Sequence, residues 1–403
     1  MSAQPSHATI LPGALVHGQP ATLGVMGGGQ LGRMFVHAAQ RMGYFTAVLD
    51  PDASSPAGLV SHHHIQTAYL DEQGLAQLVR HSAAITTEFE NVPAPALRTL
   101  GAQRPVAPAA EAVAIAQDRA LEKAHFVRCG VPVAPHAVIE TSEDLAALLS
   151  PTAGDGQTDL FPGILKTARL GYDGKGQVRV KTREALAAAW DELKRVPCVL
   201  EKMLPLAAEC SVIVARGADG QMVHFPVQRN LHRDGILAVT EVHEGNVPAD
   251  LAAQAIAATR SVAEGLQYVG VLCVEFFILQ DHSLVVNEMA PRPHNSGHYS
   301  LDACDHSQFD LQVRALAGLP LPPPRLHSPA IMLNLLGDIW LDFNDLPPWD
   351  RVLALPGAHL HLYGKLKAAQ GRKMGHLNLI GRSVDEVRAT ALTAAAILGI
   401  APF

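Results

Sequence analysis

The chain is poor in cysteine, has no long apolar run and carries no excess of positive charge. Wide spacing and an odd count of cysteines exclude a zinc-finger pattern and a disulfide framework, which favours a reducing cytoplasm. None of the apolar runs approaches the roughly 18 residues that a membrane helix needs. The net charge of −7 argues against nucleic acid as the main partner, because a duplex-binding protein shows a basic face. The five cysteines are Cys129, Cys198, Cys210, Cys273 and Cys304.

The length of 403 residues exceeds what one hydrophobic core usually holds, and two to four domains are expected. Residues 1–20 lack the basic start and apolar core of a signal peptide, and we interpret them as a loose, disordered leader. Breaks in the pattern suggest three further units, residues 21–117, 118–320 and 321–403. The last boundary falls at the prolines of residues 320–324.

The sequence from residue 271 to residue 298 predicts a β-hairpin that carries a metal site. Two apolar runs are separated by the polar residues 280–282, and each run contains one carboxylate, Glu275 or Glu288. Two carboxylates in neighbouring apolar strands are costly unless a cation pairs with them. Oxygen ligands, with Asn287 as a possible third, suit Mg²⁺ together with substrate phosphates. The hairpin therefore suggests nucleotide chemistry.

A polar loop follows this hairpin directly. Arg292, His294, Asn295, Ser296 and His298 stand there among prolines and glycines. A guanidinium group offers a planar fork to carboxylate or phosphate oxygens, so the loop is a candidate anion site. The alternative is a polar loop that merely caps the hairpin.

A glycine pattern near the start reads strand, glycine loop, helix, strand. Gly27, Gly29 and Gly32 have dinucleotide-binding spacing, and Asp50 ends the next strand. Any anionic ligand at a helix N-terminus would want the same glycines, and close helix packing alone would also explain them. Glu88 and Glu90 follow a later strand of the same unit, where a ribose contact, a salt bridge or a helix cap would each suit a glutamate.

A second glycine-rich stretch, residues 171–177 with the sequence GYDGKGQ, lies between two expected strands. Its backbone N–H groups could bind phosphates, and the loop could close as a lid. Lys166 ends the preceding apolar strand, where phosphate is the natural partner of an ammonium group. The Walker A pattern GxxxxGK[ST] is absent from the sequence. A flexible hairpin tip is the alternative.

Cations cluster again near the C-terminus, in a region of short strands followed by a helix. Lys365, Arg372 and Lys373 precede the segment GHLN. Such a cluster is too small for a nucleic acid and would suit a single phosphate group. An ordinary solvated turn explains it equally well.

Taken together, these motifs resemble those of ATP-grasp ligases. The pattern of Glu275, then Asn287 and Glu288, then residues 290–298 (APRPHNSGH), is closest to the N5-carboxyaminoimidazole ribonucleotide synthetase family of purine biosynthesis, and GYDGKGQ and GRKMGHLN also match it. The resemblance covers about residues 21–382. It implies a mixed α/β and α+β fold with an N-terminal Rossmann-like (pre-ATP-grasp) domain, a central ATP-grasp domain and a small β-rich C-terminal domain.

The resemblance also implies roles for individual residues. Lys123 is expected to be a surface charge of its helix. Glu275 and Glu288 would bind Mg²⁺. The residues implied in catalysis are Arg292, His294, Asn295, Tyr172 and Asp173. Those implied for the acceptor substrate are Gln30, Leu31, Glu88, Ser296, Lys365, Arg372 and Lys373. Those implied for ATP are Arg119, Lys166, Gly171, Tyr172, Asp173, Gly174, Lys175, Gly176, Gln177, Glu201, Lys202, Met203, Leu204, Glu209, His232, Asn287 and Glu288.

The implied activity is carboxylation of 5-aminoimidazole ribonucleotide with ATP and bicarbonate through carboxyphosphate, in a cytoplasmic homodimer. A sibling ligase, such as formate-dependent glycinamide ribonucleotide transformylase, would share the metal and nucleotide residues. An NAD-dependent oxidoreductase would explain the first glycine loop but leave the carboxylate hairpin unused. A nucleotide-binding regulator without turnover is a third alternative, which the intact Glu275, Glu288 and Lys166 oppose.

Overall fold

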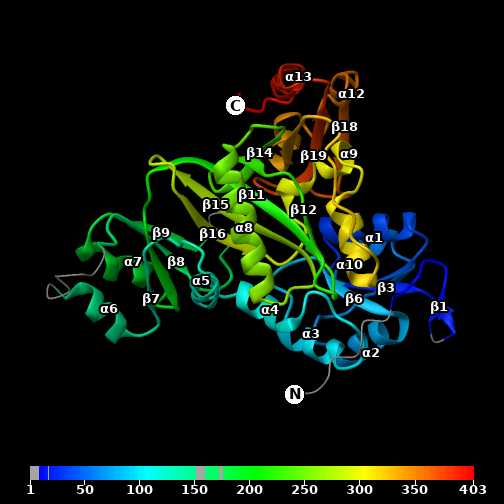
Figure 1. The fold of residues 1–403 in the computed structure, drawn as a ribbon, viewed down its shortest axis with the longest axis horizontal. Helices are drawn as coiled ribbons and strands as arrows, with labels where there is room; N and C mark the ends of the chain where they lie inside the picture. Colours follow the sequence, from blue (N-terminus) through cyan, green and yellow to red (C-terminus); the bar gives the residue numbers. More distant parts are fainter. Residues whose placement is uncertain (1–8, 17, 151–158, 172–175) are drawn as a thin grey trace.

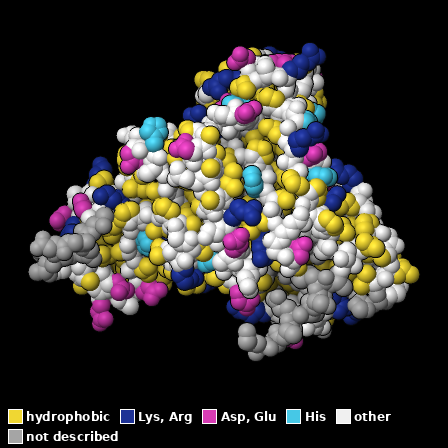
Figure 2. Space-filling view, in the orientation of Figure 1, with side chains coloured by type: hydrophobic (Ala, Val, Ile, Leu, Met, Phe, Trp, Pro, Cys, Tyr) yellow, Lys and Arg dark blue, Asp and Glu magenta, His cyan; other side chains and the backbone are white. Residues whose placement is uncertain are grey.

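The computed structural model describes residues 9–16, 18–150, 159–171 and 176–403. Two regions flank one large sheet (Figure 1): a blue and cyan N-terminal region, and a small green sheet at the opposite side. The orange and red C-terminal region contributes strands to the large sheet itself. None of the described helices is long and apolar enough to cross a membrane. Charges of both signs are scattered over the face seen in Figure 2 without a large patch of one sign.

The N-terminal region is a four-stranded parallel sheet with the order β5-β4-β3-β6. Three of its strands, β3, β4 and β6, are almost wholly buried, as expected for a parallel sheet covered by helices. The predicted Rossmann-like arrangement is therefore present. Its elements are β3 (Thr22–Met26), α1 (Gln30–Arg41), β4 (Phe45–Leu49), β5 (His63–Ile65), α2 (Glu72–His81), β6 (Ala84–Thr87), α3 (Ala94–Gly101) and α4 (Ala110–Ala116).

The leader expected to be loose is ordered over its described part. β1 (Leu15–Val16) and β2 (Gln19–Pro20) form a small antiparallel pair. The side chain of Ile10 is buried, its N–H donates to the Ala317 carbonyl at 2.8 Å, and its carbonyl accepts from the Tyr44 hydroxyl at 2.6 Å. The expectation was wrong for residues 9–16 and 18–20 because one apolar side chain with two backbone bonds is enough to hold this segment. Residues 1–8 and 17 lie outside the described part.

A second, antiparallel sheet has the order β7-β10-β8-β9 and follows helix α5 (Arg119–Arg128). Helices cover its apolar side, where Trp190 of the second helix packs with Leu165 and Leu200 of the strands. The elements are β7 (His136–Ile139), α6 (Ser142–Leu149), β8 (Gly163–Thr167), β9 (Gln177–Val180), α7 (Leu186–Glu192) and β10 (Cys198–Lys202).

The large sheet has nine strands and runs through both the central and the C-terminal regions. Its order is β16-β15-β11-β13-β14-β17-β19-β18, with β12 paired to β11. The proline-rich segment around residue 322 does not interrupt it, since β14 pairs with β17 on the other side of that segment. Its strands are β11 (Leu206–Arg216), β12 (Met222–His224), β13 (Gln228–Arg233), β14 (Ile236–Val242), β15 (Gly270–Leu279), β16 (Leu284–Ala290), β17 (Ala330–Leu336), β18 (Ala358–Leu362) and β19 (Lys373–Ile380).

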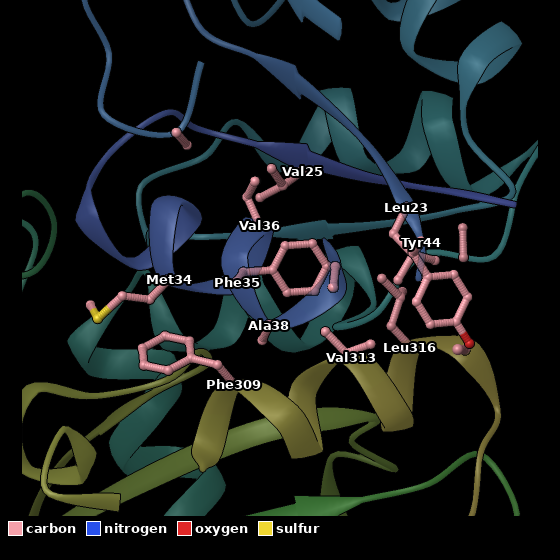
Figure 3. Packing of buried hydrophobic residues seen from close by; sticks show 14 of the residues in the cluster. Leu23, Val25, Met34, Phe35, Val36, Ala38, Tyr44, Phe309, Val313 and Leu316 are labelled. Atoms are coloured by element: carbon pink, nitrogen blue, oxygen red, sulfur yellow. The ribbon is translucent and has the colours of Figure 1, made fainter. Parts of the chain in front are cut away.

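The remaining helices cover this sheet and join it to the N-terminal region. Figure 1 shows α8 (Ala249–Gly265) lying across the central strands. Helix α10 (Gln308–Ala317) packs against α1, and Figure 3 shows Phe309, Val313 and Leu316 facing Phe35 and its neighbours. The other helices are α9 (Ser300–Ala303), α11 (Gly337–Asp342), α12 (Trp349–Leu353) and α13 (Val384–Ile397).

Candidate active site

The predicted carboxylate hairpin is present. Strands β15 and β16 are antiparallel neighbours, and Glu275 lies directly opposite Glu288. The register shifts just beyond this pair, so that Phe276 faces Val286 and Asn287 is the extra residue of a bulge. Bulges of this kind redirect side chains beside active sites. Here the bulge lies directly beside the facing carboxylates Glu275 and Glu288, which both line one cavity.

Cationic side chains surround the two carboxylates. Arg119 Nη1 lies 3.3 Å from Glu288 Oε2, and His294 Nε2 lies 3.0 Å from Glu275 Oε1. Burial alone would raise the pKa of Glu275, but the neighbouring imidazole of His294 lowers that pKa to about 2. Glu275 is therefore ionised over the working pH range, as a metal ligand must be.

The donor atoms fit the Mg²⁺ that the sequence predicts. Both carboxylates and the Asn287 amide offer oxygen, the ligand type that Mg²⁺ prefers. Asn287 Oδ1 is buried and finds no hydrogen-bond partner among the described residues. A buried, unsatisfied carbonyl oxygen is costly, and a cation would satisfy it. The residues therefore fit a hard divalent ion.

Arg292, the arginine of the predicted anion loop, forms an ion pair with Glu90. Burial would raise the pKa of Glu90, but the Arg292 guanidinium lowers it to about 2. Arg292 Nη1 also donates to the Pro293 carbonyl at 3.0 Å. The guanidinium is thus fixed in one orientation before any anion arrives. Of the alternatives weighed for Glu90, the salt bridge is the one present.

A cavity of about 560 Å³ brings together most of the residues predicted for the acceptor substrate. It lies between the N-terminal region, the anion loop and the C-terminal cations. Asn295 Nδ2, at its wall, is buried and has no hydrogen-bond partner among the described residues. The predicted residues that line it are Gln30, Leu31, Glu88, Arg292, His294, Asn295, Lys365, Arg372 and Lys373.

A second, smaller cavity of about 170 Å³ adjoins the first. It is lined by both hairpin carboxylates, by Arg119 and by Gly171, the first residue of the predicted phosphate loop. Four residues belong to the walls of both cavities: Glu90, Arg292, His294 and Lys373. A wall that includes Arg292 and His294 of the anion loop therefore separates the cavity beside the carboxylate hairpin from the larger cavity.

The C-terminal cations Lys365, Arg372 and Lys373 line the larger cavity, and Lys373 also belongs to the wall shared with the smaller one. Lys365 Nζ donates to the Lys373 carbonyl at 2.7 Å, and Arg372 Nη1 donates to the Lys367 carbonyl at 2.6 Å. Burial, and then the charge of Arg372, lower the pKa of Lys365 to about 8. An ammonium group desolvated in this way gains from an anionic ligand.

The first glycine loop uses its amides internally. Gly28 N–H donates to Asp50 Oδ2 at 2.7 Å, and Gly29 N–H donates to Glu88 Oε1 at 2.9 Å. Gly32 N–H donates to Glu88 Oε2 at 3.2 Å. Glu88 thus caps helix α1, one of the alternatives considered for it. Because carboxylates hold the amides that a dinucleotide pyrophosphate would need, the oxidoreductase alternative loses its only sequence support.

Glu201 forms ion pairs with two lysines, Lys166 and Lys123, and the position of Lys123 was predicted wrongly. Lys166 Nζ lies 3.2 Å from Glu201 Oε1, and Lys123 Nζ lies 3.1 Å from Glu201 Oε2. The Lys123 side chain is only 1% exposed, so it is not the surface charge expected of it. Helix α5 turns this face inward, toward β10. The Lys123 ammonium group can be buried there because the Glu201 carboxylate neutralises its charge.

Other predicted nucleotide residues have partners of their own. His232 Nδ1 contacts Glu209 Oε2 as an ion pair. The N–H groups of Lys202 and Met203 donate to the carbonyls of Pro135 and Pro162, both at 2.9 Å, so these two amides are already used. Leu204, Gly176 and Gln177 lie in the described part, and Gln177 begins β9. Tyr172, Asp173, Gly174 and Lys175 lie outside the described residues.

Ser296 does not reach the cavity where it was expected to touch substrate. It is fully buried, and its hydroxyl lies 2.9 Å from His294 Nδ1 and accepts from the Ser211 hydroxyl at 2.8 Å. It therefore orients His294 instead. Gln308, which the sequence analysis missed, does the same from α10: its side chain accepts from His294 N–H at 2.9 Å and donates to the His294 carbonyl at 2.8 Å.

Glu122 is a second missed residue. It is buried in the smaller cavity and accepts from Met289 N–H at 2.7 Å. Burial, and then the charge of Glu288, raise its pKa to about 8. Arg119, Glu122, Lys123 and Phe126 are spaced three, four and seven residues apart, which places them on one helix face. This spacing in the sequence could have indicated that Glu122 lies on the same inward helix face as Arg119.

Comparison with known proteins gives a consistent result along the chain. Three family models match in order: a ribonucleotide synthetase preATP-grasp domain at residues 20–117, an ATP-grasp domain at 124–309, and a phosphoribosylaminoimidazole carboxylase C-terminal domain at 330–390. The fold and the paired carboxylates thus define an ATP-grasp enzyme.

Individual relatives show which family of ATP-grasp enzymes the chain belongs to. An N5-carboxyaminoimidazole ribonucleotide synthase of Brucella melitensis is 43% identical over 89% of this chain and 96% of its own, and one of Staphylococcus aureus is 40% identical over 91% and 94%. A solved ADP complex of an N5-carboxyaminoimidazole ribonucleotide synthetase superposes with a TM-score of 0.85 at 37% identity, covering 97% and 98%. The structure of an Aspergillus clavatus enzyme in complex with ADP and 5-aminoimidazole ribonucleotide superposes with a TM-score of 0.84 at 30% sequence identity. The match covers 94% of this chain and 99% of that one. The chain belongs to the N5-carboxyaminoimidazole ribonucleotide synthase family.

Proposed function

We propose that the protein carboxylates the amine of 5-aminoimidazole ribonucleotide with ATP and bicarbonate, giving N5-carboxyaminoimidazole ribonucleotide, ADP and phosphate. The observation that carries the proposal is the pair of adjoining cavities. One is lined by the carboxylate hairpin, the other by the C-terminal cations, and the anion loop belongs to both. Two adjoining cavities with a common anion-binding wall suit a reaction in which ATP and the ribonucleotide react through a small anionic intermediate.

The smaller chamber holds the triphosphate end of ATP. Arg119 and Lys166 supply positive charge, and Gly171, which lines this chamber, begins the glycine-rich segment whose backbone N–H groups we assign to the phosphates. Lys166 leaves Glu201 for a phosphate oxygen when ATP binds, while Lys123 stays and keeps Glu201 neutralised. Glu209 and His232 face the ribose, and the segment 201–204 lies against adenine.

Glu275, Glu288 and Asn287 would hold Mg²⁺, which neutralises phosphate charge and orients the terminal phosphoryl group when it is bound. A bicarbonate oxygen attacks that phosphorus, the bond from the phosphorus to the bridging oxygen breaks, and carboxyphosphate and ADP result. Arg292, His294 and Asn295 bind this anion at the wall common to both chambers. Glu90 fixes the guanidinium and leaves its remaining N–H groups directed at the anion.

The larger chamber holds the ribotide. Lys365, Arg372 and Lys373 bind its phosphate, and Gln30, Leu31 and Glu88 line the end nearest helix α1. The aminoimidazole nitrogen then attacks the carbon of carboxyphosphate, with phosphate as the leaving group, or attacks CO₂ released from it together with phosphate. Tyr172 and Asp173 remain proposed catalytic residues. Because carboxyphosphate hydrolyses quickly, the closed site must exclude water.

The test is a coupled assay of phosphate release. Release that needs ATP, Mg²⁺, bicarbonate and 5-aminoimidazole ribonucleotide together is expected. Release that needs formate and glycinamide ribonucleotide instead would favour the sibling transformylase. Binding of ATP without turnover under any of these conditions would favour a regulator.

The compartment and the assembly are also proposals. All five cysteines are free thiols, which supports a reducing cytoplasm. A homodimer is the expectation from the family resemblance. Light scattering at micromolar concentration tests it, and a monomeric mass would contradict it.

A further inference from the structure

One cysteine lies beside the carboxylate hairpin, and the proposed reaction makes no use of it. Cys273 and Glu275 are two residues apart on β15, so their side chains point to the same face of the sheet. The Cys273 sulfur, a carboxylate oxygen of Glu275 and a ring nitrogen of His294 all lie within 4.8 Å of one another. Both Cys273 and Glu275 are buried. Sulfur, nitrogen and oxygen donors therefore converge from a strand and a loop.

This donor set differs in chemistry from the one proposed for Mg²⁺. Thiolate and imidazole are the ligands that Zn²⁺ prefers, whereas Mg²⁺ takes oxygen almost exclusively. Three protein ligands with a fourth position open are the arrangement of an accessible zinc site. Glu275 and His294 line the smaller cavity, so an ion can enter from that side.

Hydroxyl groups already surround these donors in the manner of a second coordination shell. Ser296 Oγ lies 2.9 Å from His294 Nδ1, the ring nitrogen that faces away from Glu275. Burial, and then the charge of Glu275, raise the pKa of the Cys273 thiol, and the hydroxyls of Ser296 and Ser211 act in the opposite direction. Such partners fix the orientation of a ligating histidine and stabilise a thiolate. When zinc displaces the proton on Nε2, a proton on Nδ1 is donated to Ser296 Oγ, the 3.3 Å bond from Ser296 N–H to Nδ1 is lost, and the thiol proton leaves to solvent.

We infer that Cys273, Glu275 and His294 form a site for Zn²⁺ or a similar soft divalent ion, which overlaps the magnesium site through Glu275. An ion held there removes Glu275 from magnesium and His294 from the anion loop. Zinc is thus expected to inhibit the enzyme in competition with magnesium. Only this last consequence rests on the proposed function.

The first experiment needs no turnover. Co²⁺ is titrated into the full chain without ATP or Mg²⁺, and the near-ultraviolet band of a thiolate–cobalt bond is recorded. Wild type is expected to show the band, and Cys273→Ser and Cys273→Ala are expected to lack it. Two variants are used so that a folding defect in one leaves the other to decide. Cys198→Ala, which removes a buried thiol from the separate sheet of β10, is the matched control and should keep the band.

The second experiment measures inhibition. Cys273 is outside the proposed catalytic machinery, so Cys273→Ser should keep the basal rate while needing at least about tenfold more Zn²⁺ for half-inhibition. A band that persists in both Cys273 variants, or zinc sensitivity equal to that of wild type, would overturn the site. If the proposed carboxylation fails but the cobalt band depends on Cys273, the metal site stands and only the proposed function falls.

Discussion

Lys365 is a cation whose charge depends on pH within the range of ordinary enzyme assays. Burial and Arg372 favour its neutral form and lower its pKa to about 8, so the ammonium is present below that pH and lost above it. If Lys365 binds the ribotide phosphate, the KM for 5-aminoimidazole ribonucleotide should rise as pH increases through about 8. Steady-state kinetics from pH 7 to 9.5 measure this.

The matched variant is Lys365→Arg, because a guanidinium stays charged throughout that range. It should flatten the rise in KM above pH 8. An equal pH dependence in the variant and in wild type would assign the titration to another group.

Lys123 carries a second prediction for a single residue. It is 1% exposed and pairs with Glu201, so Lys123→Met removes one of two cations from a buried carboxylate. Breaking a buried pair outright costs about 3–5 kcal/mol, and the remaining Lys166 should hold the loss in unfolding free energy near the lower end. The KM for ATP should also rise, because Lys166 then stays with Glu201. Urea unfolding and ATP kinetics measure both effects, and wild-type values for both would contradict the role.

Prediction from sequence succeeded for residues in a regular strand pattern and failed where burial is set by distant partners. A carboxylate within an apolar run reveals Glu275 and Glu288 directly. Lys123 looks like any helix-surface lysine until Glu201, 78 positions later, is brought beside it. Glu88 and Glu90 could be placed at a strand end, but only the folded chain decides that one caps α1 and the other pairs with Arg292.

At the scale of elements, the β15–β16 hairpin provides a direct test. Glu288→Ala should abolish turnover, because it removes a proposed metal ligand and the partner of Arg119. Glu288 sits in a bulged position with its side chain 42% exposed, so the hairpin core is left intact. Loss of activity with an unchanged thermal midpoint is expected. A rate close to that of wild type would remove the metal assignment.

Elements with strong local signals were predictable. The hairpin, the strand–loop–helix start and the C-terminal strands and helix all occur where the pattern indicates. The function of the first glycine loop could not be predicted, because the same glycine spacing suits a loop that binds a ligand and a loop whose amides bond carboxylates of the protein itself. A Cβ on Gly29 would lie 2.6 Å from Glu88 Oε1, so this glycine is needed for the internal cap itself.

For the whole molecule, the nine-stranded sheet makes the C-terminal region part of the central one. Val239 pairs with Leu333 and Val242 with Ala330 across the proline-rich segment. Removing residues 328–403 would expose the edge of β14 and its apolar face, which promotes aggregation. The truncated chain is expected to be insoluble or aggregated in size-exclusion chromatography, with the full chain as control. A monodisperse, folded fragment would show that the two regions are independent. This joining of regions had no sequence signal, since prolines usually mark separation.

Because the side chains of Glu90, Arg292, His294 and Lys373 line both cavities, the proposed ATP and ribotide sites form what amounts to a single elongated receptor. A compound that tethers a nucleoside polyphosphate mimic to an aminoimidazole ribotide mimic through a carboxylate-sized spacer would engage both ends at once. Linking the two groups turns the second contact into an intramolecular event, and the gain over either half alone can reach about 10²- to 10⁴-fold. The geometry of this wall therefore favours bisubstrate inhibitors over mimics of either substrate.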